Sequence, residues 1–439
     1  MANDLTQGSI LDNIRRFSLP YMLSYFLQIL YGLADLFVIG LYCDVDSTTA
    51  VSNGAQVMHM FTVVIIGLAM GSTVLIGKSV GAGDSRQVSR LISDTVILFG
   101  GVAIVMTAAL LALNKNIVQL INTPLEAVQG TVDYLAICFA GIPFIVAYNI
   151  IASIFRGLGD SKSPMWFVVI ACIVNIVLDF IFIGHMELGP KGAALGTVLS
   201  QVVSVIVALV AIRAKHLLPK VSLKADIDSM GKILGIGVPV ALQDGFIQVS
   251  FIIITIIANS RGLVDAAAVG IVEKFIGLLF IVPSTMLATV SAVSSQNLGA
   301  GRPDRARKTM RSAIFIATSF GLAASVLLQF IPESAVRIFT NDPGVISQGA
   351  DYLRSYVWDC ALAGVHFCYS GLFMACGWSL ISFLHNFFSI LVRIPFAYLA
   401  SINSPDNLYA MGLASPVGSL ASVLICIAFY RWMRRRGII

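Results

Sequence analysis

The chain has 439 residues, of which 57% are apolar and 12% charged, and its mean hydropathy of +0.89 lies far above that of soluble domains. This composition excludes a soluble globular protein and predicts an all-α membrane protein. The formal net charge of +5 does not indicate a nucleic-acid partner, because the basic residues lie at the ends of apolar runs rather than in one patch.

Apolar runs long enough to cross a bilayer recur from Phe17 to Trp432 between short polar segments. They are too long for the strands of a membrane barrel, so we expect helices. Twelve spans are predicted, at residues 14–40, 50–77, 91–113, 130–155, 164–184, 192–213, 233–258, 266–290, 312–331, 347–376, 379–401 and 409–432.

The ends of these spans indicate how the chain is oriented. The N-terminal segment contains Asp4 and Asp12 and leads directly into a full-length span, so no cleaved signal peptide is expected. Most lysines and arginines fall in alternate loops, which by the positive-inside rule predicts that both termini are cytoplasmic. An even number of spans agrees with this orientation.

The second half of the chain repeats the first at an offset near 219 residues, as between Leu19-Pro20 and Val238-Pro239. With six spans each, the halves have the same orientation, so we expect a pseudo-two-fold axis along the membrane normal. The predicted domains are an N-terminal six-helix lobe at 1–212, a cytoplasmic linker at 213–232 and a C-terminal six-helix lobe at 233–439. A central cavity is expected between the lobes.

Asp35 in span one and Asp179 in span five are the candidate functional carboxylates of the first lobe. A charge at bilayer depth costs at least about 2.5 kcal/mol, so such a residue indicates a functional site by default. No lysine or arginine lies near them in either span. The alternative interpretation is that both carboxylates only hydrogen-bond to neighbouring helices.

Spans five and six contain further residues whose oxygen atoms can bind a cation together with these carboxylates. Asn175 lies one helical turn before Asp179, and Ala193 and Thr197 have the same spacing in the Gly-rich span six. Carboxylates, an amide, a hydroxyl and a backbone carbonyl are hard ligands that suit Na⁺. The same set suits protons, because two nearby carboxylates raise each other's proton affinity. Asn175 and Thr197 equally suit interhelical hydrogen bonds.

Three further features of the spans are notable. Gln28 and Tyr31 share a helical face with Asp35. Pro20 predicts a kink in span one, and the sequence leaves open whether it is an ordinary membrane-helix proline or a hinge. In the second lobe, adjacent Glu273 and Lys274 point about 100° apart and so do not pair with each other. We interpret the second-lobe charges as a structural polar network; they are Asp244, Glu273, Lys274 and Arg393.

The chain resembles the multidrug and toxic compound extrusion transporters over essentially its whole length, most closely their prokaryotic DinF-like branch. The likeness rests on the two-lobed plan of twelve spans, FSLP at the start of span one, YGLADLFVIG within it, and the paired GAG turns after spans two and eight. Other branches carry a Glu on span seven, where this chain has Gln243 and Asp244. The residue roles that the resemblance implies are a cation-coupling site at Asp35, Asn175, Asp179, Ala193 and Thr197, a substrate cavity at Gln28, Tyr31 and Asn149, and a hinge at Pro20.

The resemblance also implies a function, namely a secondary active antiporter of the prokaryotic inner membrane. Such a protein exports small organic, often cationic and amphipathic, compounds in exchange for H⁺ or Na⁺. We expect a monomer in contact with membrane lipids, without a further cofactor. ATP is not expected to drive the export, because the chain has no GxxxxGK[ST] loop. An enzyme is not expected, because the histidines have no zinc-ligand spacing. The alternative is a flippase for a lipid-linked oligosaccharide, which usually has a cationic cavity, whereas the first lobe here is acidic.

Overall fold

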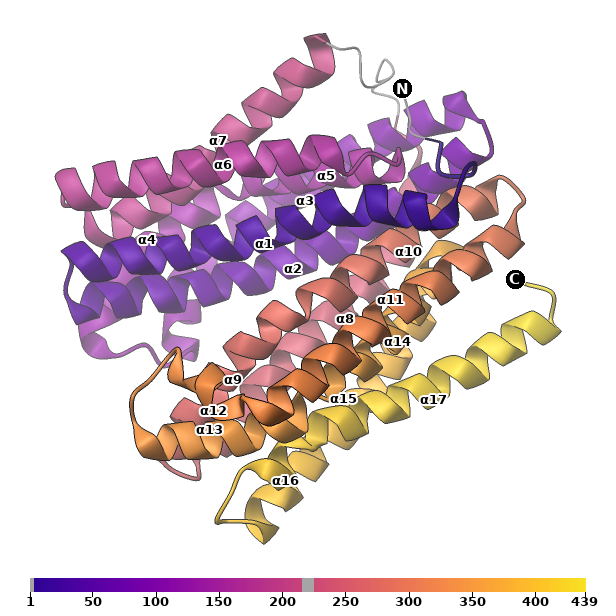
Figure 1. Ribbon diagram of the computed structural model, residues 1–439. Coiled ribbons are helices and arrows are strands. Elements are labelled where there is room, and N and C mark those ends of the chain that lie inside the picture. Colours follow the sequence, from indigo (N-terminus) through magenta and orange to yellow (C-terminus); the bar gives the residue numbers. More distant parts are fainter. Residues whose placement is uncertain (1–3, 215–224) are drawn as a thin grey trace. The chain divides into compact units, whose positions relative to one another are not determined.

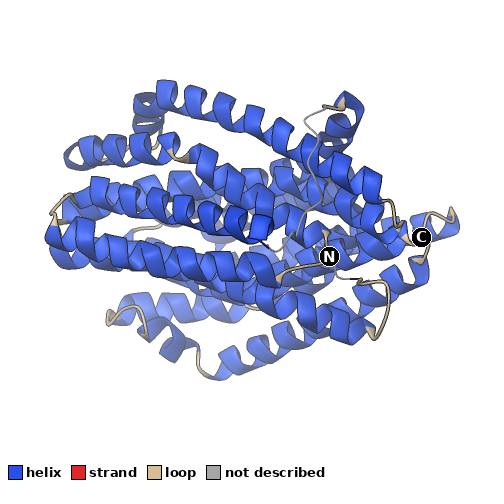
Figure 2. Ribbon diagram, turned by 90° about the horizontal axis from the view of Figure 1, so that it is seen from above, coloured by secondary structure: helices blue, strands red, loops and turns tan. Residues whose placement is uncertain are grey.

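The computed structural model describes residues 4–214 and 225–439, and every regular element in these residues is a helix (Figure 1; Figure 2). The described residues form two compact units. Unit 1 comprises Leu19–Gly237, and unit 2 comprises Asp4–Ser18 together with Val238–Ile439. Two helices, α1 (Ile10–Tyr42) and α8 (Ile227–Asn259), contribute residues to both units.

The other helices of unit 1 follow α1 in chain order. They are α2 (Val45–Gly81), α3 (Ser85–Leu120), the short η1 (Leu125–Ala127), α4 (Val128–Ala140), α5 (Ile142–Gly157), α6 (Lys162–Asp179), the π-helix η2 (Phe180–His185) and α7 (Gly189–Ala214).

The other helices of unit 2 follow α8. They are α9 (Leu263–Leu279), α10 (Ile281–Gly299), α11 (Pro303–Phe330), α12 (Pro332–Arg337), α13 (Pro343–Tyr356), α14 (Asp359–Cys376), α15 (Ser379–Asn403), α16 (Tyr409–Gly412) and α17 (Ala414–Arg435).

The lengths and composition of these helices confirm a multi-pass, all-α membrane protein. Within residues 4–214 and 225–439, eleven helices are long and apolar enough to cross a membrane, and the bent pair formed by η1–α4 and α5 raises the number to twelve. The pair bends by 50° at Gly141. Pro143 follows in the first turn of α5, where its missing N–H costs no helical hydrogen bond.

The two GAG turns end helices in the same way in both halves of the chain. Helix α2 ends at Gly81 and α10 at Gly299, and two residues later Gly83 and Gly301 have φ values of +72° and +68°. Residues without a side chain adopt this left-handed conformation at the lowest cost, which explains glycine at both positions. In the first repeat Asp84 then begins the next helix by accepting a hydrogen bond from the Gln87 N–H at 2.9 Å.

The N-terminal segment packs with unit 2, whereas the sequence-based division placed it in the first lobe. Its backbone carbonyls accept side-chain hydrogen bonds from the last turn of α10 and from the turn that follows it. Asn297 Nδ2 donates to Leu5 O at 3.2 Å, and Arg302 Nη1 donates to Thr6 O at 2.9 Å. Such contacts join residues almost 300 positions apart, so no local sequence pattern encodes them.

The second division between the units lies at Gly237, beyond the predicted end of the linker at residue 232. The start of α8 packs directly on α2, because a methyl group at Gly237 would overlap Leu68 O and one at Gly71 would overlap Ile233 O. This close backbone approach explains why the first turns of α8 belong to unit 1. Residues 215–224 of the predicted linker lie outside the described residues.

In unit 2, Arg261 holds the loop between α15 and α16. Its Nε donates to Asp265 at 2.7 Å, and its two terminal nitrogens donate to the backbone carbonyls of Ser401, Ser404, Pro405 and Asn407 at 2.7–3.2 Å. The side chain is only 7% exposed. One guanidinium group therefore satisfies carbonyls that no helix uses.

Candidate functional site

Asp35 of α1 and Asp179 at the end of α6 lie in the interior of unit 1. The two residues are 4% and 0% exposed, and their carboxyl groups lie within electrostatic range of each other. Thr197 of α7 donates its hydroxyl hydrogen to Asp35 Oδ2 at 3.1 Å. Helices α1, α6 and α7 thus bring side-chain oxygens to one buried position, which we call the acidic cluster together with Asn175.

Asn175 lies one helical turn before Asp179, so both side chains project from the same face of α6. They lie against Gly196 of α7. A methyl group at Gly196 would overlap Asp179 Oδ1 and would lie 3.7 Å from Asn175 Nδ2. Because Gly196 has no side chain, α7 can approach α6 closely and still leave room for the Asp179 carboxylate.

Most polar atoms of the acidic cluster make no hydrogen bond of ordinary geometry to another described residue, although the side chains of Asp35, Asp179 and Asn175 lie close together. This holds for Asp35 Oδ1, for both carboxylate oxygens of Asp179 and for both amide atoms of Asn175, all of which are buried. Buried polar atoms usually make such a hydrogen bond, and an unpaired buried charge is strongly unfavourable. No lysine or arginine of the described chain lies near enough to affect either carboxylate. The cluster therefore has the chemistry of a site for a proton or a cation.

The ligand types narrow the choice of cation. In the part of the chain that the structure describes, no three His, Cys, Asp or Glu side chains converge on a common metal position. Two carboxylates with an amide and a hydroxyl oxygen form a small set of hard ligands. Such a set fits a monovalent ion or a shared proton better than a transition metal.

The chain directly after Asp179 leaves the α-helical register. It continues as the π-helix η2, a geometry that occurs frequently at functional sites. Gly192 of α7 packs against η2, where a methyl group would lie 3.1 Å from Phe182 O. Ala193 is fully buried in the same part of α7. The sequence did not predict η2, because a change in helical hydrogen-bond register has no signature in hydropathy.

The predicted substrate-cavity residues have different surroundings. Gln28 and Tyr31 are half-buried on α1; Tyr31 lies within electrostatic range of Asp35, and Gln28 interacts with the Tyr148 hydroxyl. Asn149 of α5 is 6% exposed, and its Nδ2 donates to the carbonyl four residues earlier at 2.8 Å. The structure thus brings Tyr31 near the acidic cluster and engages Asn149 within its own helix.

Pro20 lies inside α1, directly after Leu19, the first residue of that helix that belongs to unit 1. Pro239 lies inside α8 directly after Val238, the first residue of α8 that belongs to unit 2. The two prolines therefore mark equivalent positions in the two helices that contribute to both units.

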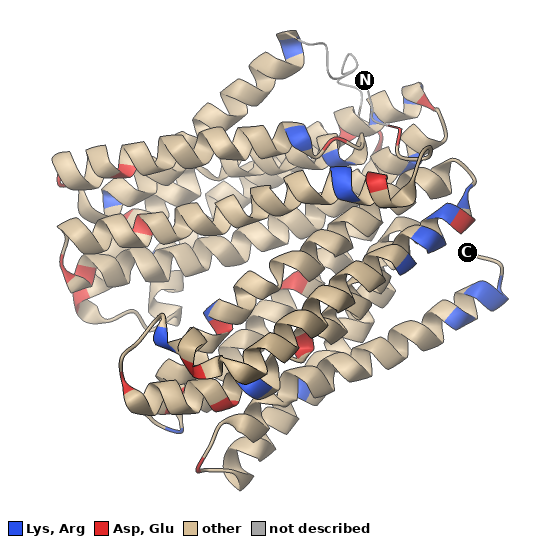
Figure 3. Ribbon diagram, in the orientation of Figure 1, with Lys and Arg blue, Asp and Glu red and all other residues tan. Residues whose placement is uncertain are grey.

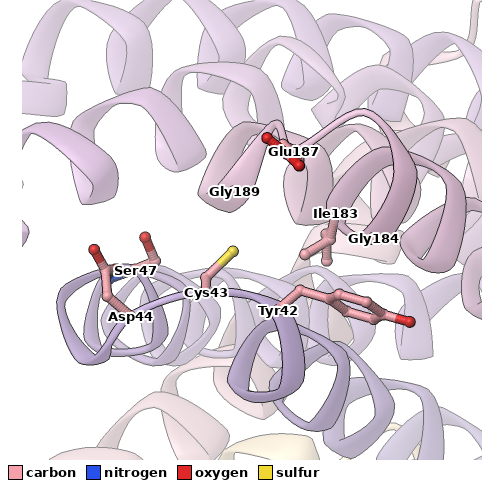
Figure 4. A pocket seen from close by; sticks show the side chains of 8 residues that line it. All are labelled: Tyr42, Cys43, Asp44, Ser47, Ile183, Gly184, Glu187 and Gly189. Atoms are coloured by element: carbon pink, nitrogen blue, oxygen red, sulfur yellow. Dashed lines mark hydrogen bonds between the residues drawn. The ribbon is translucent and has the colours of Figure 1, made fainter.

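A separate polar pocket of about 330 Å³ lies where α1 ends and η2 ends (Figure 4). It is lined by Tyr42, Cys43, Asp44, Ser47, Ile183, Gly184, Glu187 and Gly189. Hydrogen bonds from Ser47 hold the pKa of the exposed Asp44 carboxyl below its ordinary value, so this group is ionised at neutral pH. The pocket contains none of the residues predicted for the cation site.

Unit 2 contains a second buried polar group around Arg393 of α15, which is 8% exposed. Its Nη2 donates to the Tyr356 hydroxyl at 3.2 Å, and its guanidinium carbon lies 4.8 Å from the centre of the Phe251 ring. Glu273 of α9 and Asp359 of α14 lie within electrostatic range of Arg393. One buried cation thus faces two carboxylates.

The composition of this network differs from the sequence-based prediction. Lys274 is exposed, and in the described residues it has no hydrogen bond or ion pair, so the structure does not include it. Asp244 is half-buried on α8, and Gln243 Nε2 donates to its Oδ1 at 3.4 Å. Asp359 was missed, although an acidic residue inside a predicted span gave the same signal as Asp35.

Comparisons with known proteins agree with this architecture. The family model described as MatE matches residues 20–181 and again residues 239–399, so its two matches begin at Pro20 and Pro239. A probable multidrug resistance protein, YpnP of Bacillus subtilis, is 27% identical over the whole of this chain and 98% of its own length. An FAD transporter of Shewanella oneidensis is 24% identical over 95% of this chain and 93% of its own. The solved structure of a MOP superfamily transporter from Pyrococcus furiosus, 23% identical, covers 99% of this chain and 97% of its own with a TM-score of 0.91.

Proposed function

This chain belongs to the MatE family of multidrug and toxic compound extrusion transporters, and we propose that it is a secondary active antiporter. It exports small organic compounds, often cationic and amphipathic, in exchange for H⁺ or Na⁺. We further propose that it works as a monomer in a prokaryotic inner membrane, with both termini in the cytoplasm. The basic residues of alternate loops support this orientation.

The observation that carries the proposal is the acidic cluster with its unpaired oxygens. Asp35 and Asp179 are almost completely buried, and no basic side chain of the described residues compensates them. A pair of carboxylates in this position is stable when it shares a proton or binds a cation. Binding and release of the proton or cation at the acidic cluster would therefore be coupled to the conformation of the transporter.

The neighbouring residues would change the affinity of the acidic cluster for the proton or cation. The Thr197 hydroxyl fixes the orientation of the Asp35 carboxylate, and the free amide oxygen of Asn175 can serve as a further ligand for Na⁺. Tyr31 lies within electrostatic range of Asp35. An organic cation bound next to Tyr31 would therefore be attracted by the negative charge of Asp35. An exported cation and the coupling ion would then compete for the same negative charge, and this antagonism is reciprocal by linkage.

Efflux from proteoliposomes with separately imposed pH and Na⁺ gradients tests the proposal. The panel contains fluorescent organic cations and also FAD, because one relative is named as an FAD transporter. We expect ion-driven efflux of cations by the native protein and its loss in Asp35→Asn and Asp179→Asn. The matched control is Asp133→Asn, which makes the same chemical change at an acid that pairs with Lys191 at 3.3 Å near the protein surface. Native-like coupling in both cluster variants would refute the role of the cluster.

A further inference from the structure

Basic residues gather at the C-terminal end of α17 (Figure 3). They are Arg431, Arg434 and Arg435 in its last turns and Arg436 directly after it, and all four are exposed. Within residues 4–214 and 225–439 their guanidinium groups make no ion pair or side-chain hydrogen bond, and the one contact with an aromatic ring is that of Arg436 over Trp432 at 5.8 Å. One cation is enough to complement the helix dipole. Four unpaired charges in six positions indicate an anionic partner.

Three aromatic rings form a platform beside these arginines. The centroids of Phe429 and Trp432 lie 4.9 Å apart, and Trp378, which directly precedes α15, lies 5.9 Å from Trp432 and 6.3 Å from Phe429. Trp378 and Trp432 remain 40% and 38% exposed. Exposed tryptophans in a membrane protein are typical of the depth of the lipid headgroups.

Two of the arginines continue an apolar stripe on the same helix. Leu420, Leu424, Arg431 and Arg435 have the spacing i, i+4, i+11 and i+15, which places them along one side of α17. The two leucines are 48% and 60% exposed, as side chains that face lipid tails would be. Arg431 follows Leu424 by about 10 Å along the helix axis. The change from leucine to arginine on one stripe is the pattern expected where hydrocarbon gives way to headgroups.

We propose that this surface, formed by the four arginines with Trp378, Phe429 and Trp432, binds the headgroup of an anionic phospholipid. The guanidinium groups would pair with the phosphate, and the aromatic platform would hold the adjoining glycerol and upper acyl chain. A soluble nucleic acid would match the charge but not the apolar stripe that leads into it. The lipid matches both.

Quenching of tryptophan fluorescence by brominated lipid tests this locally. In Trp166→Phe/Trp358→Phe protein, the emission comes only from Trp378 and Trp432, the two tryptophans of the surface. The protein is reconstituted in phosphatidylcholine vesicles that contain a small fraction of either phosphatidylglycerol or phosphatidylcholine brominated near the headgroup. We expect an apparent preference for the anionic lipid of about fivefold or more, since one basic side chain near an anionic surface contributes roughly that factor.

Two variants built on this protein separate charge from fold. Changing all four arginines to glutamine should abolish the preference, whereas changing all four to lysine should retain it. The control removes four exposed basic groups from unit 1 by changing Arg86, Lys162, Arg213 and Lys232 to glutamine, and it should keep the preference. Equal quenching by the two brominated lipids in the parent protein, or an undiminished preference in the glutamine variant, would overturn the proposal.

Discussion

The substitution Gly196→Ala tests whether the position of the Asp179 carboxylate determines ion coupling. The added methyl group would overlap Asp179 Oδ1, so the carboxylate has to move by about 1 Å to restore an ordinary contact. Overpacking of this kind costs about 1–3 kcal/mol, and replacing a glycine inside a helix recovers about 0.5–1 kcal/mol. The net loss of stability should therefore be at most about 2.5 kcal/mol. The protein should still fold.

The effect on transport should be much larger than the effect on stability. A displacement of about 1 Å at a site of fixed geometry can reduce a rate by about 100-fold. We expect ion-driven efflux by Gly196→Ala to fall by about 10-fold to 100-fold, with a small change in melting temperature. The assay is efflux from proteoliposomes across a series of pH and Na⁺ gradients, with thermal melting of the same preparation.

Gly101→Ala provides the matched control for this experiment. Gly101 also lies inside a helix of unit 1, on α3, and a methyl group there has no heavy atom within 4 Å. This variant should transport as the native protein does and should be slightly more stable. If Gly196→Ala and Gly101→Ala show the same coupled efflux at every gradient, the close packing of α7 on Asp179 has no functional role and the reasoning is refuted.

Three further predictions follow from the same contacts. Asp35→Asn and Asp179→Asn should each abolish coupling, and the double variant should be no worse, as expected for residues that serve one step; multiplicative losses would instead indicate independent sites. Arg261→Lys should expose the loop before α16 to hydrogen exchange, because lysine cannot satisfy the backbone carbonyls that the guanidinium holds; native-like protection would contradict this role. In a variant without native cysteines, a cysteine at Asp46 should react with an impermeant reagent outside the cell and one at Ser85 should not, and the reverse pattern would overturn the proposed orientation.

Features that depend on depth and composition could be predicted from the sequence. The spans follow from apolar runs, and Asp35 and Asp179 stand out because a charge within an apolar run is costly. The spacing of Asn175 and Asp179 then places both on one face of a helix. The glycines of the Gly-rich span six include Gly192 and Gly196, and these lie where α7 packs closely on η2 and Asp179.

Features that depend on contacts between distant residues could not be predicted. Lys274 looked buried because its span is apolar, but the face that a side chain occupies is set by neighbouring helices, and Lys274 is exposed. In the contact between the N-terminal segment and unit 2, Arg302 donates to a backbone carbonyl. Every residue has such a carbonyl, and in the sequence Arg302 looks like any other basic residue of a loop. Only the folded chain shows that this arginine donates to Thr6 O.

The division of α1 and α8 between the units gives their prolines a specific mechanical meaning. If the two units of a transporter moved with respect to each other, a helix that contributes residues to both would have to bend. A proline weakens its helix about one turn earlier, because it removes one backbone hydrogen bond and its ring pushes against the carbonyl four residues before it. Pro20 and Pro239 each follow the division by one residue, so the weakened turn includes the last residues assigned to the other unit. We therefore propose that the repeated Leu-Pro and Val-Pro pairs make α1 and α8 more compliant at the division between the units, with Pro20 and Pro239 as hinges.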